Sequence, residues 1–188
     1  EWITQKLRES PALRMLVPRI YGLGDLSQIL DGRAKAQAEA ILSALGDDIS
    51  KLVVTRVYRQ AARAVATHGY VLVLGEPAAG KSTIGAGLGV GALDRWGCQT
   101  LKVLDADDFI AHWNPEDPKR FYWIDDAFGT TQYQPELVHK WNTAWLHLST
   151  AIRKGARVLM TSRDYIYRSA RQDLKSTSFP LLNESQVV

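Results

Sequence analysis

What this sequence of 188 residues lacks excludes several classes of protein. It has one cysteine, Cys98, which excludes an internal disulfide framework and a zinc site built from several cysteines. No apolar run approaches the ~20 residues of a membrane-spanning helix. The given residues do not begin with the charged and then apolar segment of a secretory signal. With 46% hydrophobic and 23% charged residues, it is neither disordered nor fibrous. We expect a soluble globular protein without membrane contact, in the cytoplasm.

The overall charge gives little information about partners. The formal net charge is +3, from 23 basic and 20 acidic residues, which permits contact with nucleic acid without arguing for it. Basic side chains are most concentrated in residues 151–175, where they outnumber acidic ones. That stretch could contact nucleic acid or an acidic partner, and we favour a solvated helix face.

The chain is predicted to divide into two regions. Residues 1–46 are predicted to be a helical or linker segment, because prolines and glycines interrupt them and no alternating strand pattern occurs. Residues 47–188 are predicted to form the main domain. The first residue is Glu1 rather than methionine, and residues 185–188 resemble the start of a strand. We therefore expect a fragment of a larger protein, truncated at its C-terminal end.

Strand and helix patterns alternate along the main domain. Continuous apolar runs predict strands buried on both faces, and apolar positions spaced by three and four predict helices. Thr55 is placed to cap a new helix within the first helical region. This alternation predicts an α/β fold with a parallel sheet covered by helices. The predicted strands are 70–74, 101–104, 121–124 and 157–160, and the predicted helices are 48–68, 81–96 and 135–153.

The sequence Gly-Glu-Pro-Ala-Ala-Gly-Lys-Ser at residues 75–82 matches the phosphate-loop pattern G-x-x-x-x-G-K-[ST] in full. It follows a predicted strand and opens a predicted helix, which is the context that this pattern requires. The glycines allow consecutive amides to point at an anion, and the helix adds its positive end. We expect Lys81 to reach the β- and γ-phosphates of a nucleotide and the Ser82 hydroxyl to bind Mg²⁺. The alternative is a glycine turn beside a surface lysine.

Two carboxylates directly follow the predicted strand 121–124. We expect Asp125 to hold Mg²⁺ through water, and Asp126 to orient or polarise the attacking water. The alternative is a turn or a helix cap after the strand. The pair favours hydrolysis, because a kinase needs only the first carboxylate.

A polar cluster, residues 161–164, ends the predicted strand 157–160, at the edge of a parallel sheet where ligands bind. We expect Arg163 to contact the γ-phosphate and to stabilise charge in the transition state. The alternative is a surface ion pair of Arg163 with Asp164, or the start of a helix.

Other features receive structural interpretations. The spacing of the glycines between residues 85 and 91 does not fit a dinucleotide fingerprint, because Val90 stands where G-x-G-x-x-G requires glycine. These glycines are expected to allow close helix packing. His139 and His147 lack partners at metal spacing. The six tryptophans are expected to be packing anchors.

The three motifs in this order resemble a STAND NTPase, a class of P-loop NTPases, and more narrowly the third novel STAND family of bacterial conflict and antiphage proteins. The likeness covers about residues 53–170, and its most specific parts are DDAFG at 125–129 and TSRDYI at 161–166. Val54, Thr55 and Tyr58 are similar to the family segment that lies against adenine. Arg19 lies in a segment similar to a motif that precedes the nucleotide domain in related switches. The nucleotide-binding residues implied by the resemblance are therefore Arg19, Val54, Thr55, Tyr58, Gly75, Glu76, Pro77, Ala78, Ala79, Gly80, Lys81, Ser82 and Thr83.

The resemblance implies a function beyond nucleotide binding. STAND proteins are typically multidomain switches in which ATP binding leads to self-association and activates an effector. For this chain it implies ATP and Mg²⁺ as ligands, slow hydrolysis, self-association in the full-length protein, and effector and sensor domains outside these residues. It also implies a bacterial origin.

Two other functions remain open at the level of sequence. A small P-loop kinase fits the length, and the basic stretch 151–175 could mimic its lid, but the paired aspartates favour water as the acceptor. A nucleic-acid motor fragment would need a second strand-binding motif, and none is visible.

Overall fold

The computed structural model describes residues 40, 43, 55–174 and 187–188. The expectations for the segment 1–46, apart from residues 40 and 43, and for Arg19 and Val54 lie outside these residues. So does the first part of the predicted helix 48–68, whose described part begins at Thr55. No helix in the described part of the chain is long and apolar enough to cross a membrane.

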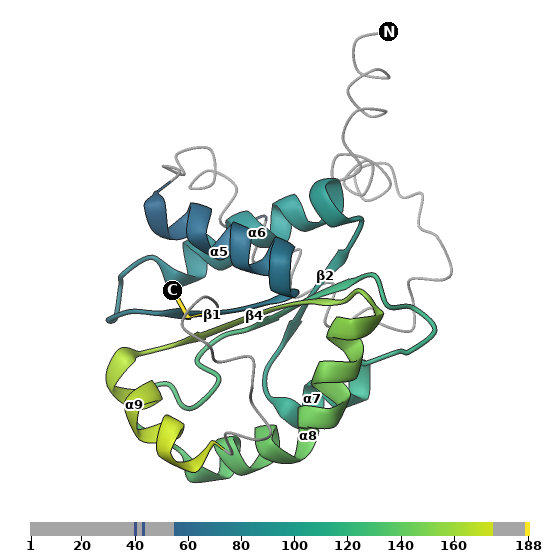
Figure 1. Cartoon of the computed structure of the whole chain (residues 1–188). Coiled ribbons are helices and arrows are strands. Elements are labelled where there is room, and N and C mark those ends of the chain that lie inside the picture. The colour runs from purple at the N-terminus through teal and green to yellow at the C-terminus, as the bar shows by residue number, and fades with distance from the viewer. Residues whose placement is uncertain (1–39, 41–42, 44–54, 175–186) are drawn as a thin grey trace, which may run out of the picture.

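Four parallel strands form the sheet, as predicted, and they are β1 (Tyr70–Leu74), β2 (Gln99–Val103), β3 (Arg120–Ile124) and β4 (Arg157–Ser162). Their spatial order is β1-β4-β3-β2 (Figure 1). The predicted limits of β1 are confirmed. β2 begins two residues before its predicted start and ends one residue before its predicted end. β3 begins one residue before its predicted start, and β4 ends two residues after its predicted end.

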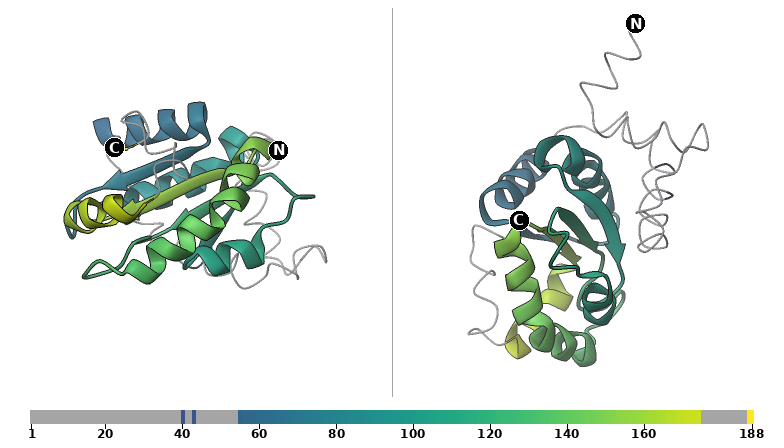
Figure 2. Two further views of the ribbon diagram at one scale, coloured as in Figure 1. Left: turned by 60° about the horizontal axis from the view of Figure 1, so that its bottom comes forward. Right: turned by 90° about the vertical axis from the view of Figure 1, so that its right-hand side faces the viewer.

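Helices cover both faces of this sheet (Figures 1 and 2). One face packs against α5 (Arg56–His68) and α6 (Lys81–Trp96). The opposite face packs against α7 (Ala106–His112), α8 (Pro135–Lys154) and α9 (Asp164–Asp173). The predicted α/β fold is therefore confirmed, with a three-layer arrangement.

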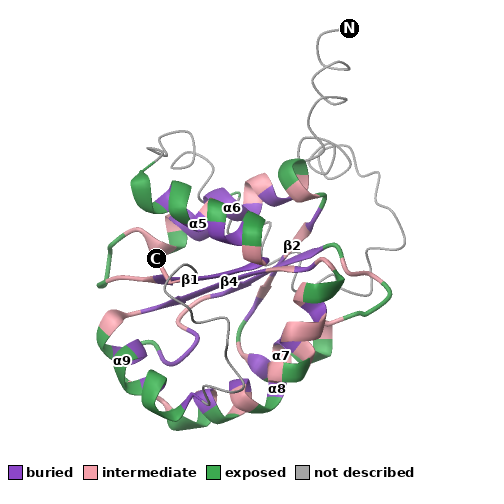
Figure 3. Ribbon diagram, in the orientation of Figure 1, coloured by how far each residue is buried: buried purple, intermediate pink, exposed green. Residues whose placement is uncertain are grey.

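β1, β3 and β4 each contribute to two hydrophobic cores, because successive side chains point to opposite faces, whereas β2 contributes Leu101 and Val103 to one core only. On β3, Tyr122 and Ile124 join the core under α7, α8 and α9, whereas Phe121 and Trp123 join the core under α5 and α6. The central strands are buried on both faces, as Figure 3 shows for the ribbons between the helical layers. This burial explains why the strands read as continuous apolar runs.

Capping residues explain where several helices begin. The Thr55 Oγ1 accepts a hydrogen bond from the Tyr58 amide at 3.1 Å, which confirms the predicted cap. Pro135 is the first residue of α8, a position where its missing N–H costs nothing. One helix, α7, was not predicted, and a helix start at the position of α9 was weighed only as an alternative for residues 161–164. α7 has only seven residues and depends on the Asp105 side chain, which accepts from two amides, and α9 is short and mostly polar.

The end of the chain returns to the sheet beside β1. Val187 forms a parallel bridge with Leu72, and the Leu74 amide donates to the Val188 carbonyl at 2.7 Å. The predicted strand character of residues 185–188 is thus confirmed for the last two of them. These two residues pair with the side of β1 away from β4.

The topology leaves a crevice at the carboxyl ends of β1 and β4. The chain leaves β1 toward α6 on one face, and it leaves the neighbouring β4 toward α9 on the other face. Ligands of open α/β sheets bind where two adjacent strands connect to opposite faces in this way. The predicted phosphate loop and the polar cluster after β4 therefore meet at one place.

Candidate phosphate-binding site

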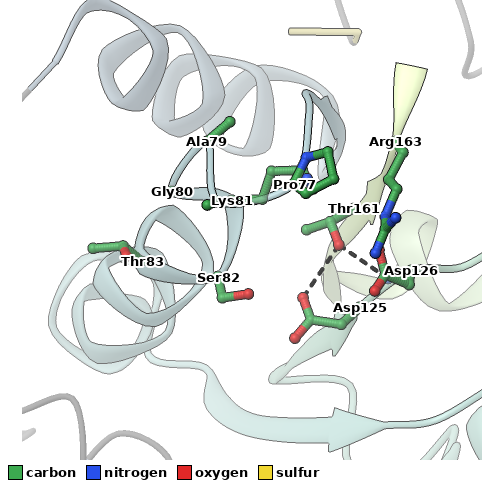
Figure 4. A pocket seen from close by; sticks show the side chains of 11 residues that line it. Pro77, Ala79, Gly80, Lys81, Ser82, Thr83, Asp125, Asp126, Thr161 and Arg163 are labelled. Carbon is green, nitrogen blue, oxygen red and sulfur yellow. Dashed lines mark hydrogen bonds between the residues drawn. The ribbon is translucent and has the colours of Figure 1, made fainter. Parts of the chain in front are cut away.

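A pocket of about 360 Å³ lies at this crevice. Three segments line it: the loop after β1 together with the start of α6, the residues after β3, and the end of β4 (Figure 4). This volume falls in the range of roughly 300–1,000 Å³ that small-molecule sites occupy. The lining residues are Pro77, Ala78, Ala79, Gly80, Lys81, Ser82, Thr83, Asp125, Asp126, Thr161 and Arg163.

The loop between β1 and α6 wraps around the Lys81 side chain. The Lys81 Nζ donates to the carbonyl oxygens of Gly75 and Glu76, each at 2.8 Å. Two loop residues adopt left-handed backbone conformations, Ala78 with φ +62° and Gly80 with φ +83°. Glycine adopts this conformation readily, whereas alanine is strained in it, and such strain is found at ligand-binding loops. The loop therefore directs the lysine and the start of α6 toward one cavity.

Asp125 lies directly after β3, and three donors from the described residues contact its carboxylate. The Trp123 Nε1 donates to the Asp125 Oδ1 at 2.8 Å, and the Thr161 hydroxyl donates to the same oxygen at 3.2 Å. The Asp125 Oδ2 forms an ion pair with the Lys102 ammonium. In Figure 4 the Asp125 carboxylate and the Ser82 hydroxyl point toward one another across the pocket.

Asp126 follows with a left-handed backbone, φ +48°. Its amide donates to the Thr161 Oγ1 at 3.0 Å, so the Thr161 hydroxyl connects both aspartates to β4. Partial burial, and then the neighbouring Asp125 charge, raise the pKa of the Asp126 carboxyl, while Lys81, Arg163 and Lys102 offset part of the effect. A half-buried carboxyl with a raised pKa beside cations is typical of functional sites.

Arg163 lies at the junction of β4 and α9, and its side chain lines the pocket. Its guanidinium donates to the Tyr165 hydroxyl at 3.0 Å, and that hydroxyl donates to the Thr131 carbonyl oxygen at 2.9 Å. The helix start that was weighed as an alternative for this segment is present, because α9 begins at Asp164, and the contact of Arg163 with a γ-phosphate stays a prediction.

Four of the residues implied by the resemblance, among those that the structure describes, do not line this pocket. Thr55 is exposed and caps α5, and Tyr58 is buried against α6 with its hydroxyl donating to the Gly87 carbonyl oxygen at 3.4 Å. Gly75 and Glu76 contact the site through the carbonyl oxygens that hold Lys81. A nucleotide base would have to lie outside the described pocket to meet Tyr58.

The expected packing role of the α6 glycines is confirmed for Gly85. A Cβ atom there would lie 2.7 Å from the Trp123 indole, so only glycine allows α6 to approach this ring. It does not extend to Gly91, where a Cβ would meet only the Arg95 side chain at 3.8 Å. Trp123 and Trp141 are fully buried, as expected of packing anchors. In the described part of the chain, no group of three or more His, Cys, Asp or Glu side chains is placed to hold a metal.

Comparison with known proteins identifies the family. A sequence model of the family described as Novel STAND NTPase 3 matches residues 52–188, well over half of the chain. The chain belongs to this family. It is therefore a STAND-type NTPase module, and the resemblance drawn from its motifs is confirmed. No curated protein matches the sequence.

Three residues of this STAND NTPase contact the predicted site residues but were not assigned to the site from the sequence. Lys102 contacts Asp125, and Thr161 contacts both Asp125 and Asp126. Tyr165 contacts Arg163. Lys102 had a visible signal, because a lysine between Leu101 and Val103 interrupts an apolar strand. Thr161 had one as well, because it belongs to the polar cluster 161–164, and Tyr165 lies in the TSRDYI motif, but its contact with Arg163 depends on how α9 packs.

Proposed function

We propose that this STAND NTPase module binds ATP with Mg²⁺, hydrolyses it slowly, and acts as a nucleotide-dependent switch. The observation that carries the proposal is the convergence of Lys81, Asp125, Asp126 and Arg163 from three elements on one pocket. Two cations and two carboxylates around a phosphate loop are the groups that triphosphate binding and hydrolysis require.

Lys81 and the loop amides would bind the phosphates. The Lys81 ammonium now interacts with the carbonyl oxygens of Gly75 and Glu76, which are weaker partners than a phosphate would be. A nucleotide would exchange these contacts for ones in which the acceptor is charged as well. The positive end of α6, which begins at Lys81, would add to the attraction.

Ser82 and Asp125 would hold Mg²⁺. A hydroxyl and a carboxylate that face one another across the pocket offer the hard oxygen ligands that this ion prefers (Figure 4). When bound, Mg²⁺ neutralises charge on the phosphate oxygens. The contacts of Trp123 and Thr161 hold the Asp125 carboxylate in this orientation.

Asp126 and Arg163 would act on the terminal phosphate. The raised pKa of Asp126 makes its carboxylate a stronger base, suited to orient and polarise an attacking water. The Arg163 guanidinium would stabilise the charge that develops on the phosphate and distinguish the triphosphate from the diphosphate. Because Arg163 directly precedes α9, a change in the group that the Arg163 guanidinium contacts would alter the position of that helix.

The same proposal places the module in a larger signalling or antiphage-defence protein. Its support is the family, and the nucleotide state would govern self-association there, together with effector and sensor domains. The bound triphosphate would favour the associating state only if it contacts that state better than the other.

Calorimetry with ATP and with GTP, with and without Mg²⁺, tests the proposal, followed by phosphate release from the same sample. We expect ATP to bind more tightly in Mg²⁺ and to release phosphate slowly without any added acceptor. Turnover that requires an added small acceptor would indicate a kinase, and the absence of Mg²⁺-dependent binding would refute the proposal.

Two variants assign the roles. Lys81→Ala should lose roughly 100-fold in ATP affinity, because a charge-assisted contact to phosphate is removed. Asp126→Asn should bind ATP like the parent and lose turnover, since asparagine tolerates the left-handed backbone but cannot act as a base. If both variants bound and hydrolysed ATP like the parent, the site would be wrongly assigned.

A further inference from the structure

Lys102 lies in the middle of β2, where the pleat directs it to the face covered by α6. Its neighbours Leu101 and Val103 point to the other face and are fully buried there. In the parallel register Lys102 pairs with Trp123 on β3, so the two side chains lie side by side on one face. Asp125 follows Trp123 by two residues and lies just past the end of β3.

These three side chains form one contact unit. The Lys102 Nζ lies 4.1 Å from the centroid of the Trp123 ring and pairs with the Asp125 Oδ2. The indole Nε1 of Trp123 donates to the other carboxylate oxygen at 2.8 Å. The ammonium therefore has an aromatic face on one side and a carboxylate on another.

The pair is largely shielded from water. The Lys102 and Asp125 side chains are 16% and 22% exposed. An ion pair at this depth is screened less than a surface pair, so the lysine is a strong partner for the carboxylate. Asp125 is the pocket-lining residue with which Lys102 forms its ion pair.

We propose that Lys102 is a built-in counter-cation of Asp125 that competes with Mg²⁺ for this carboxylate. The inference rests on the proposed function, because it takes Asp125 as the metal-binding carboxylate. With Lys102 in place the charge of Asp125 is already neutralised, and a divalent ion must displace the ammonium or share the carboxylate with it. Lys102 thereby raises the Mg²⁺ concentration at which nucleotide binds tightly, and its departure moves a cation away from the Trp123 ring.

The Mg²⁺ dependence of nucleotide affinity tests this competition. Affinity for a non-hydrolysable ATP analogue is measured by calorimetry on the full chain over a series of Mg²⁺ concentrations, for the parent and for Lys102→Met, Lys102→Arg and Lys140→Met. Methionine keeps the unbranched apolar stem and removes the charge. Lys140 is a matched control, because it also pairs with carboxylates, those of Asp105 and Asp107, but does not line the pocket.

We expect Lys102→Met to lower the half-saturating Mg²⁺ concentration at least about fivefold, because a like charge beside the metal is removed. Lys102→Arg should leave it equal or raise it, and Lys140→Met should leave it unchanged. The tryptophan emission should change when Mg²⁺ and the analogue bind the parent, and this change should be reduced in Lys102→Met and in Trp123→Phe.

The outcomes separate the inference from the function on which it rests. If the parent binds the analogue in a Mg²⁺-dependent way, and Lys102→Met has an equal or higher Mg²⁺ requirement, the competition is refuted while the proposed function stands. If the parent shows no Mg²⁺-dependent binding, the proposed function is refuted and the inference falls with it. Far-ultraviolet circular dichroism of each variant verifies that it is folded before binding is compared.

Discussion

Asp126 combines a left-handed backbone, φ +48°, with a half-buried carboxyl whose pKa is raised by burial and by Asp125. Above the ordinary aspartate pKa of about 3.9, the folded state therefore holds this proton more firmly than the unfolded state. The contribution of Asp126 to the free energy of unfolding consequently falls as pH rises from the ordinary aspartate pKa through the higher pKa of the folded state. A conformation and an ionisation state that both disfavour folding are concentrated in one residue of the site, as expected where function sets the requirement.

We predict that Asp126→Asn is more stable than the parent at neutral pH. The gain should widen as pH rises above about 4 and should be constant below it, because asparagine does not titrate. Thermal unfolding of both proteins between pH 3 and pH 7 measures the difference, in which the titration of all other groups cancels. Asp126→Ala should show less gain, because alanine costs about 1 kcal/mol at a positive φ. A gap that narrows with rising pH would contradict the assigned direction of the pKa.

At the scale of elements, the position of α6 is linked to the orientation of Asp125 through Gly85 and the Trp123 indole. A Cβ at Gly85 would lie 2.7 Å from the Nε1 that donates to the Asp125 carboxylate. The packing of a helix against the sheet and the orientation of a site carboxylate thus depend on the same ring. This contact explains why glycine occurs in a helix whose interior would otherwise favour alanine.

We predict opposite effects from two alanine substitutions in α6. Gly85→Ala should destabilise the fold by roughly 1–3 kcal/mol, as overpacking in a core does, and should weaken Mg²⁺-dependent nucleotide binding. Gly91→Ala should stabilise it by up to about 1 kcal/mol, because the added Cβ meets only the Arg95 side chain and helix propensity improves. Urea unfolding of both variants checks the pair. Equal effects at the two positions would refute the proposed contact with Trp123.

The strands and the phosphate loop could be predicted because each has a local signature. β1 is a buried apolar run and the loop follows a fixed pattern, so both were placed without tertiary information. α7 and α9 could not, because one is a seven-residue helix that depends on its Asp105 cap and the other has a largely polar sequence. The contact of Lys102 with Asp125 depends on the register of β2 against β3, which no local pattern contains.

At the scale of the whole molecule, the pocket is lined by segments that belong to the two different hydrophobic cores. Lys81 and Ser82 begin α6, which packs in the core shared with α5. Asp126, Thr161 and Arg163 lead into segments that pack in the other core, under α8 and α9. A ligand that contacts both groups therefore connects layers that the sheet otherwise separates. Its binding free energy adds to the stability of the whole domain rather than to one helix.

We predict that Mg²⁺ and a non-hydrolysable ATP analogue raise the Tm of the whole domain in one transition. At a ligand concentration of 100 times Kd the gain is about 2.7 kcal/mol, which for a chain of this size corresponds to roughly 5–10 °C. Scanning calorimetry with and without ligand measures it, and Lys81→Ala under the same conditions should show little shift. Two transitions, of which the ligand moves only one, would mean that the pocket does not couple the layers. An equal shift in Lys81→Ala would mean that the ligand binds elsewhere.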